Sequence, residues 1–122
     1  MTSQNGIPEI VFYRLPNYWE IFSKLDSQGI KLVTSKQLGE MLDVSSAQIR
    51  KDFSEFFTAG KQGSGYNVKA VLNLLCGILG IASDEDKRRI RINLYARQLV
   101  RATMRPNMQE VTEALIRTIA TL

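Results

Sequence analysis

The sequence predicts a mainly α-helical fold in which a winged helix-turn-helix, with a small β wing, is followed by a C-terminal helical hairpin. Three observations predict this fold. Two helix-start signals follow one another closely, at Thr34 and at Ser45. A turn with three glycines comes next, at residues 60–65. Beyond Gly80 the chain has no further glycine, and its pattern becomes that of two helices.

The residue inventory excludes several classes of chemistry. The chain has no histidine and a single cysteine, Cys76. Mechanisms that need a histidine base, a histidine-bound metal or an intramolecular disulfide are therefore excluded. We expect no catalytic residues, no metal and no cofactor, and we predict that the protein is not an enzyme. The net charge of +4 favours an anionic partner, with nucleic acid first.

The sequence shows neither a secretory signal nor a stretch that could span a membrane. The first ten residues show no secretory signal. The longest apolar stretch, residues 71–82, is interrupted by Asn73 and is too short to span a bilayer. We therefore expect a soluble, cytoplasmic protein with no membrane partner.

The first helix is expected to begin at Pro8, because proline suits the first helical turn, and to end at Gly29. Pro16 either kinks this segment or resets its start. Residues 30–33 are too few for a helix and predict a small strand. The apolar residues that recur at helical spacing in the first helix are Ile10, Leu15, Tyr18, Trp19, Phe22 and Leu25.

Two helices follow in quick succession. Thr34 and Gln37 form one predicted capping box, and Ser45 and Gln48 form a second. The expected helices cover residues 35–42 and 46–57, which is the spacing of a helix-turn-helix. Gly39 lies inside the first of them, where close packing of the second helix would explain a glycine.

The second of these helices has two distinct faces. Ile49, Phe53 and Phe56 fall on one side and predict a buried stripe. The opposite side is small, polar and cationic, which suits a helix in a DNA major groove but equally a solvated surface. Its residues are Ala47, Arg50, Lys51 and Ser54.

The glycine-rich turn at residues 60–66 carries Lys61 and can form the β-hairpin wing of a winged helix. A nucleotide-binding phosphate loop is the rival interpretation, but the turn lacks the residue order of that motif. Asn67 is expected to cap a helix that runs from Val68 to Leu79 and stops at Gly80.

With these parts assembled, residues 1–80 resemble the N-terminal DNA-binding domain of the Rex redox-sensing transcriptional repressors. The residues that carry the resemblance are Arg14, Leu15, Pro16 and Tyr18, then Ser35, Leu38 and Gly39, the run from Gln48 to Ser54, the wing glycines with Lys61, Tyr66 and Val68, and finally Ile78, Leu79 and Gly80.

The resemblance implies a homodimer that binds two-fold operators in double-stranded DNA, with a recognition helix in the major groove and a basic wing at the minor groove. Asp52 is expected to orient Arg50 or Lys51, and Tyr66 either pins the wing or contacts the DNA backbone. The positions that we assign to DNA binding are Ser46, Ala47, Gln48, Arg50, Lys51, Ser54, Lys61, Gln62, Gly63, Ser64 and Tyr66.

The chain departs from the Rex pattern in three places. Phe57 stands where the family usually has glycine, and Gln62 stands where it usually has a basic residue. Residues 81–122 contain no glycine, so the pyrophosphate-binding turn of a Rossmann domain cannot be built there. We therefore expect no nicotinamide cofactor.

Residues 81–122 form the second predicted part, a helical extension for dimerisation or a partner. Ser83 caps a helix that runs to Met104, and Asn107 and Glu110 open another after Pro106. That last helix has one apolar stripe, made of Met108, Val111, Leu115, Ile119 and Leu122.

The first helix of the extension is apolar on two faces, with Ile90, Leu94 and Met104 on one and Ile92, Tyr95 and Leu99 on the other. It needs two surfaces to bury them, either its own subunit and a partner or two surfaces within one monomer. A second copy is the simplest partner. The dimer interface that we predict consists of Leu94, Tyr95, Leu99, Met104, Leu115 and Ile119.

These observations favour a sequence-specific DNA-binding transcription regulator that acts as a dimeric repressor. The alternative is a winged-helix protein-interaction module or adaptor that docks another regulator through its C-terminal helices. The cationic residues of the recognition helix and Lys61 in the wing favour DNA, because a pure scaffold does not need them.

Overall fold

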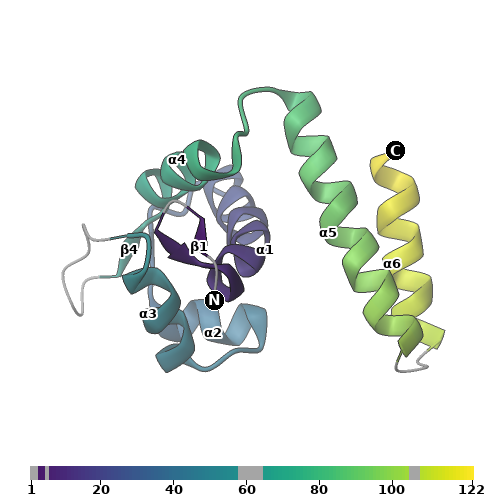
Figure 1. Ribbon diagram of the computed structural model, residues 1–122, viewed down its shortest axis with the longest axis horizontal. Coiled ribbons are helices and arrows are strands. Elements are labelled where there is room, and N and C mark those ends of the chain that lie inside the picture. Colours follow the sequence, from purple (N-terminus) through teal and green to yellow (C-terminus); the bar gives the residue numbers. More distant parts are fainter. Residues whose placement is uncertain (1–2, 5, 58–64, 105–107) are drawn as a thin grey trace. The chain divides into compact units, whose positions relative to one another are not determined.

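A computed structural model describes the chain except for residues 1–2, 5, 58–64 and 105–107 (Figure 1). The chain divides into two compact units, Met1–Leu79 and Gly80–Leu122, which we call the N-terminal unit and the C-terminal unit. The roles assigned above to the two parts of the sequence remain predictions.

In the part of the N-terminal unit that the structure describes, four helices combine with two small antiparallel sheets. Strands β1 (Ser3–Gln4) and β2 (Ile7–Pro8) pair with each other. Strands β3 and β4 form the second pair, with Leu32 opposite Asn67 and Val33 opposite Tyr66. The remaining elements, in chain order, are α1 (Glu9–Ser27), β3 (Leu32–Val33), α2 (Ser35–Leu42), α3 (Ser46–Ser54), β4 (Tyr66–Asn67) and α4 (Val68–Leu79).

Helix α1 runs without interruption through Pro16, so the segment does not restart there as one interpretation expected. Pro8 precedes the helix at its N-cap instead of lying in the first turn. Ile10 is 55% exposed, and Val11 takes its place on the buried side. The other predicted core positions of α1 are buried: Leu15, Tyr18, Trp19, Phe22 and Leu25.

Helix α2 begins with the predicted capping box. The Gln37 backbone N–H donates to the Thr34 hydroxyl at 3.1 Å, and the Thr34 N–H donates to the Gln37 side chain at 2.9 Å. At α3 only half of the predicted box is present. Ser45 accepts from the Gln48 N–H at 3.1 Å, but the Gln48 side chain binds Asp52 instead of returning to Ser45.

The turn between α2 and α3 is tight. Asp43 closes α2 in the left-handed conformation, and the Val44 N–H donates to the Gly39 carbonyl at 2.9 Å. A Cβ atom at Gly39 would overlap the Val44 carbonyl oxygen, which confirms that close packing explains this glycine. Helix α3 ends at Ser54 and not at Phe57, because residues 55–57 turn back to bond the carbonyls of Asp52 and Phe53.

The core of the N-terminal unit lies between α1, α3 and α4. Helix α4 packs along α1 and ends at Leu79 before Gly80, which has a φ of 69° as expected of a helix stop. The Ala70 N–H donates to the Asn67 side chain at 2.9 Å, which confirms the predicted cap. The large side chains at the centre are Trp19, Tyr18, Phe22, Phe53, Leu38, Ile49 and Leu75.

The C-terminal unit is a hairpin of two antiparallel helices, α5 (Asp84–Met104) and α6 (Met108–Thr121), which lie side by side (Figure 1). Ser83 caps α5 as predicted, since its hydroxyl accepts from the Asp86 N–H at 3.1 Å. Asn107, the predicted cap of α6, lies outside the described residues. No helix in the ranges that the structure describes is long and apolar enough to cross a membrane.

Of the apolar stripe predicted for α6, Val111 alone lies on the side toward α5. Smaller residues take that side: Ala114 is buried, and Val111, Thr118 and Thr121 are half-buried. Small side chains allow the two helices to approach closely, so the larger ones remain outside. The exposed members of the predicted stripe are Met108, Leu115, Ile119 and Leu122.

Candidate nucleic-acid interface

Helix α3 presents one cationic face to solvent and buries the other. Arg50 and Lys51 are exposed, as are Ala47 and Ser54. Ile49 and Phe53 are fully buried on the opposite side. The predicted orientation of this helix is therefore confirmed, although Phe56 lies beyond the end of α3 and is only half-buried.

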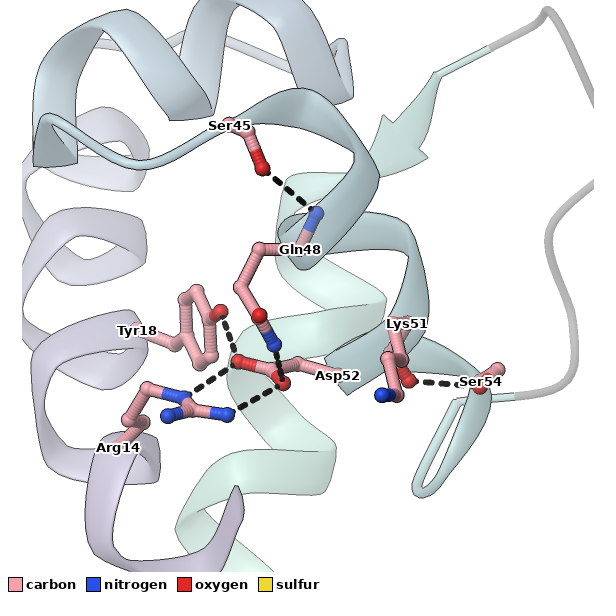
Figure 2. A network of polar contacts seen from close by, with 7 residues as sticks. All are labelled: Arg14, Tyr18, Ser45, Gln48, Lys51, Asp52 and Ser54. Atoms are coloured by element: carbon pink, nitrogen blue, oxygen red, sulfur yellow. Dashed lines mark hydrogen bonds and ion pairs between the residues drawn. The ribbon is translucent and has the colours of Figure 1, made fainter. Parts of the chain in front are cut away.

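Beneath this face, a buried carboxylate joins α3 to α1 (Figure 2). Asp52 is 0% exposed. The Arg14 guanidinium donates to both Asp52 oxygens, at 2.8 Å from Nε and 2.9 Å from Nη2. The Tyr18 hydroxyl donates at 2.5 Å and the Gln48 amide at 2.7 Å. Four donors from three side chains therefore satisfy a single carboxylate, and we call these four residues the Asp52 network.

The Asp52 network settles the charge states of its members. Burial alone would raise the pKa of Asp52, but the hydrogen bonds from Arg14, Tyr18 and Gln48 outweigh it and hold that pKa below its ordinary value. Burial and the hydrogen bond to Asp52 raise the pKa of Tyr18 far above its ordinary value. The site therefore contains an ionised Asp52 and a neutral Tyr18 at neutral pH.

The expectation that Asp52 orients Arg50 or Lys51 is wrong. Its carboxylate points into the unit, toward α1, while Lys51 and Ser54 point away from it (Figure 2). The physical reason is helical geometry, because Asp52 lies on the side of α3 that carries Ile49 and Phe53. Its charge is compensated by Arg14 inside the protein and so does not oppose an anion at the exposed face.

The polar residues of α3 differ in how free their side chains are. Gln48 is half-buried and its amide is committed to Asp52. Ser54 donates its hydroxyl to the Lys51 carbonyl at 2.6 Å. Among the residues that the structure describes, the hydrogen bond of Arg50 is a long contact of 3.4 Å to the Ser35 hydroxyl. Arg50 is therefore held weakly enough to turn toward an outside partner.

Tyr66 packs against the body of the N-terminal unit. Its ring centroid lies 4.4 Å from that of Phe53 and 6.0 Å from that of Phe57. Burial raises the pKa of its hydroxyl, and the nearby charge of Arg50 opposes this rise. Of the two roles predicted for Tyr66, the geometry matches the pinning of β4. The predicted wing contacts Lys61, Gln62, Gly63 and Ser64 lie outside the described residues.

The Asp52 network predicts acid sensitivity. Because the pKa of Asp52 is lower in the folded than in the unfolded chain, the unfolded chain binds more protons in acid, and stability rises with pH there. This contribution is complete above the ordinary value of 3.8 and is lost as the pH falls through the lower folded pKa. We expect denaturation followed by Trp19 fluorescence to show this loss, and an Asp52→Asn variant to show a flatter acid limb.

Comparisons with known proteins agree with this geometry. A family model described as "Putative DNA-binding protein N-terminus" matches residues 6–54. The redox-sensing transcriptional repressor Rex of Staphylococcus carnosus is 46% identical over 69 residues, which are 57% of this chain and 32% of that protein. Rex of Streptococcus mutans is 34% identical over 100 residues, which are 82% of this chain and 47% of that protein.

Solved structures show the same likeness. RSP in complex with β-NAD⁺ and operator DNA matches with a TM-score of 0.59 and 36% identity, over 64% of this chain and 36% of that one. A further structure of RSP, described as a Rex-family repressor, matches with a TM-score of 0.53 and 34% identity, over 63% of this chain and 34% of that one. The N-terminal unit is similar to the winged-helix N-terminal part of the Rex repressors. The chain spans less than half the length of the Rex proteins named above.

Reasoning from the sequence missed the partners of Asp52 in the N-terminal unit. Arg14 and Tyr18 were noted only as part of the Rex resemblance, with no role of their own. Arg14 and Tyr18 are four residues apart, so both lie on one side of α1, and a charged residue is next to a buried tyrosine. An arginine four residues before a tyrosine of the predicted core is the signal that could have indicated an acidic partner for both.

Proposed function

We propose that this chain is a sequence-specific DNA-binding transcription regulator that represses by occupying a two-fold operator as a homodimer. The observation that carries the proposal is the exposed Arg50 and Lys51 on a helix that the Asp52 network clamps to α1. A rigid helix with cationic side chains on its open face suits a DNA major groove, where Arg or Lys reaches guanine or phosphate. The likeness to RSP, solved with operator DNA, supports it.

In this proposal some side chains contact DNA and others hold the helix in place. Arg50 and Lys51 contact base edges and phosphates, while Gln48 is held in place by Asp52 at the border of the face. Ser46, Ala47 and Ser54 line the same helix, and Tyr66 holds β4 behind it. Lys61, Gln62, Gly63 and Ser64 are assigned to the wing from the sequence alone. The function is occupancy of DNA and involves no catalysed reaction or bound nicotinamide.

A protein-interaction role is the second candidate, because large apolar side chains of α6 are exposed. The two functions are separated by selection from a random pool of DNA duplexes, followed by fluorescence anisotropy. Enrichment of one sequence, with tighter binding to it than to a scrambled duplex at several salt concentrations, establishes the regulator. Equal and weak binding to every duplex leaves the adaptor role.

The substitution Arg50→Ala tests the proposed recognition face. We expect the affinity for the selected duplex to fall by about 5- to 150-fold, the equivalent of about 1–3 kcal/mol for an arginine that reads a base. Discrimination against the scrambled duplex should fall with it. Lys24→Ala is the control, since it removes one exposed cation at the far end of α1. Equal losses in the two variants would mean that Arg50 contributes only net charge.

A further inference from the structure

The hairpin of the C-terminal unit is apolar along one side of α6. Met108, Leu115, Ile119 and Leu122 expose between 45% and 78% of their surfaces. Successive residues of a helix are about 100° apart around its axis. On this measure the four exposed residues lie roughly a quarter turn around α6 from the residues that face α5. Helix α6 therefore carries two adjacent stripes, one covered by α5 and one left open.

Helix α5 repeats this arrangement. Leu94, Gln98 and Ala102 lie at spacings of four on the side toward α6, where Gln98 accepts from Arg117 at 3.0 Å. The half-buried Ile92 and Leu99 lie about a quarter turn around α5 from these three residues. The direction of this rotation, seen along the chain, is the same as on α6. Because α5 and α6 run antiparallel, equal rotations in the same sense bring both open stripes to one side of the hairpin.

We call this side the apolar face, and its residues are Ile92, Leu99, Met108, Leu115, Ile119 and Leu122. The opposite side of the hairpin carries charged side chains, at Arg97, Arg101, Glu113 and Arg117. The hairpin as a whole is therefore amphipathic. Leu94 is buried on the side toward α6 and Met104 lies away from the apolar face, so neither predicted interface position belongs to it.

We propose that the apolar face of one chain packs against the apolar face of a second copy, so that two hairpins form a four-helix bundle. In such a bundle each helix contacts two neighbours about a quarter turn apart, which is the spacing of the two stripes on α6. A face without charged residues is complementary to itself, as a two-fold contact requires. Nucleic acid does not fit the six residues of this face, because none of them offers phosphate a cation.

The exposed area of the apolar face is consistent with a second copy of the chain as its partner. The four α6 side chains of the face, between 45% and 78% exposed, present on the order of 500 Å², which lies in the upper part of the range of about 300–600 Å² for the largest apolar patch of a monomer, a patch that is often functional. A standard interface buries about 800 Å² per partner, so the four α6 side chains supply more than half of that area, and the half-buried Ile92 and Leu99 add to it. The inference rests on the proposed function, since the bundle would hold two recognition helices together on a two-fold operator.

The substitution Ile119→Glu in the full chain tests this proposal by analytical ultracentrifugation without DNA. We expect the wild type to sediment as a concentration-dependent dimer, and the variant to raise the dimer dissociation constant at least 100-fold. Ile116→Glu is the matched control. Ile116 is 60% exposed and Ile119 is 61% exposed on the same helix, but Ile116 points away from α5 and lies outside the apolar face.

A wild type that stays monomeric at tens of micromolar would overturn the proposal, as would a dimer that Ile119→Glu leaves intact. Circular dichroism checks that both variants keep their helices, which the exposure of both positions leads us to expect. Failure of the DNA-binding proposal is distinguishable, because it leaves the dimer in place and abolishes only the selection of a duplex. Dimer loss in Ile116→Glu to the same degree would also count against the apolar face.

Discussion

Replacement of Asp52 by alanine is expected to lower the free energy of unfolding of the N-terminal unit by about 3 kcal/mol. The substitution removes a fully buried carboxylate that accepts from Arg14, Tyr18 and Gln48. The Tyr18 hydroxyl then has no acceptor in a buried position, and the Arg14 guanidinium loses its counter-charge. Arg14 is partly exposed and can turn toward water, which keeps the loss at the lower end for a broken buried pair.

Urea denaturation followed by Trp19 fluorescence measures this loss. Trp19 is the only tryptophan and is 1% exposed, so its emission reports on the N-terminal unit. Asp26→Ala is the control, because the one side-chain contact of Asp26 among the described residues is a long, partly exposed ion pair with Lys69 at 3.9 Å, and the substitution should change stability by no more than about 0.5 kcal/mol. If the two variants unfold alike, the Asp52 network contributes no net stability.

Substitutions at Asp52 also separate the stability of the N-terminal unit from its binding of DNA. Asp52→Asn keeps the size of the side chain and an oxygen that accepts from Tyr18, so we expect a smaller loss of stability than in Asp52→Ala. Both variants release Gln48 and loosen α3 from α1. We therefore expect weaker binding of the selected duplex even at temperatures where each variant is fully folded, while Asp26→Ala binds as the wild type does.

Local signals in the sequence were sufficient for most of the helices. The capping residues Thr34, Ser45 and Ser83 act on their own neighbours, so a few adjacent residues place each helix start. Gly80 likewise ends α4 through its own backbone conformation. The exposed side of α3 follows from the same local periodicity, since Ile49 and Phe53 define the buried side.

Contacts between distant residues could not be predicted in this way. Arg14 and Asp52 are 38 positions apart, and nothing local to either states that they meet. A carboxylate on α3 was therefore assigned to its neighbours Arg50 and Lys51, although it bonds to α1. The second half of the predicted box at Ser45 failed for the same reason, because Asp52 competes for the Gln48 amide.

Hydrophobicity alone also did not show which side of α6 meets α5. Leu115 and Ile119 were predicted for a dimer interface, and that assignment stays a prediction, whereas Ala114 and Thr118 lie on the side toward α5. Close helix packing selects small side chains, and a single sequence does not show which apolar stripe meets which partner. The exposed stripe is the part of α6 that the proposed four-helix bundle would cover.

Two glycines inside helices are expected to respond in opposite directions to alanine. In Gly39→Ala the new Cβ atom meets the carbonyl oxygen of Val44, a backbone atom in the tight turn before α3. That turn must shift, and we expect a loss of about 2 kcal/mol, in the range of overpacked cores, despite the better helix propensity of alanine. The displaced α3 should also bind the selected duplex more weakly.

Gly77→Ala is the matched variant. Gly77 lies within α4, and a Cβ atom there meets nothing within 4 Å. The higher helix propensity of alanine then acts alone, so we expect the free energy of unfolding to rise by about 0.5–1 kcal/mol with no change in DNA affinity. Urea denaturation by Trp19 fluorescence measures both variants under one set of conditions. A gain in Gly39→Ala as well would show that the turn between α2 and α3 can yield, and that tight packing at this point does not set the position of the recognition helix.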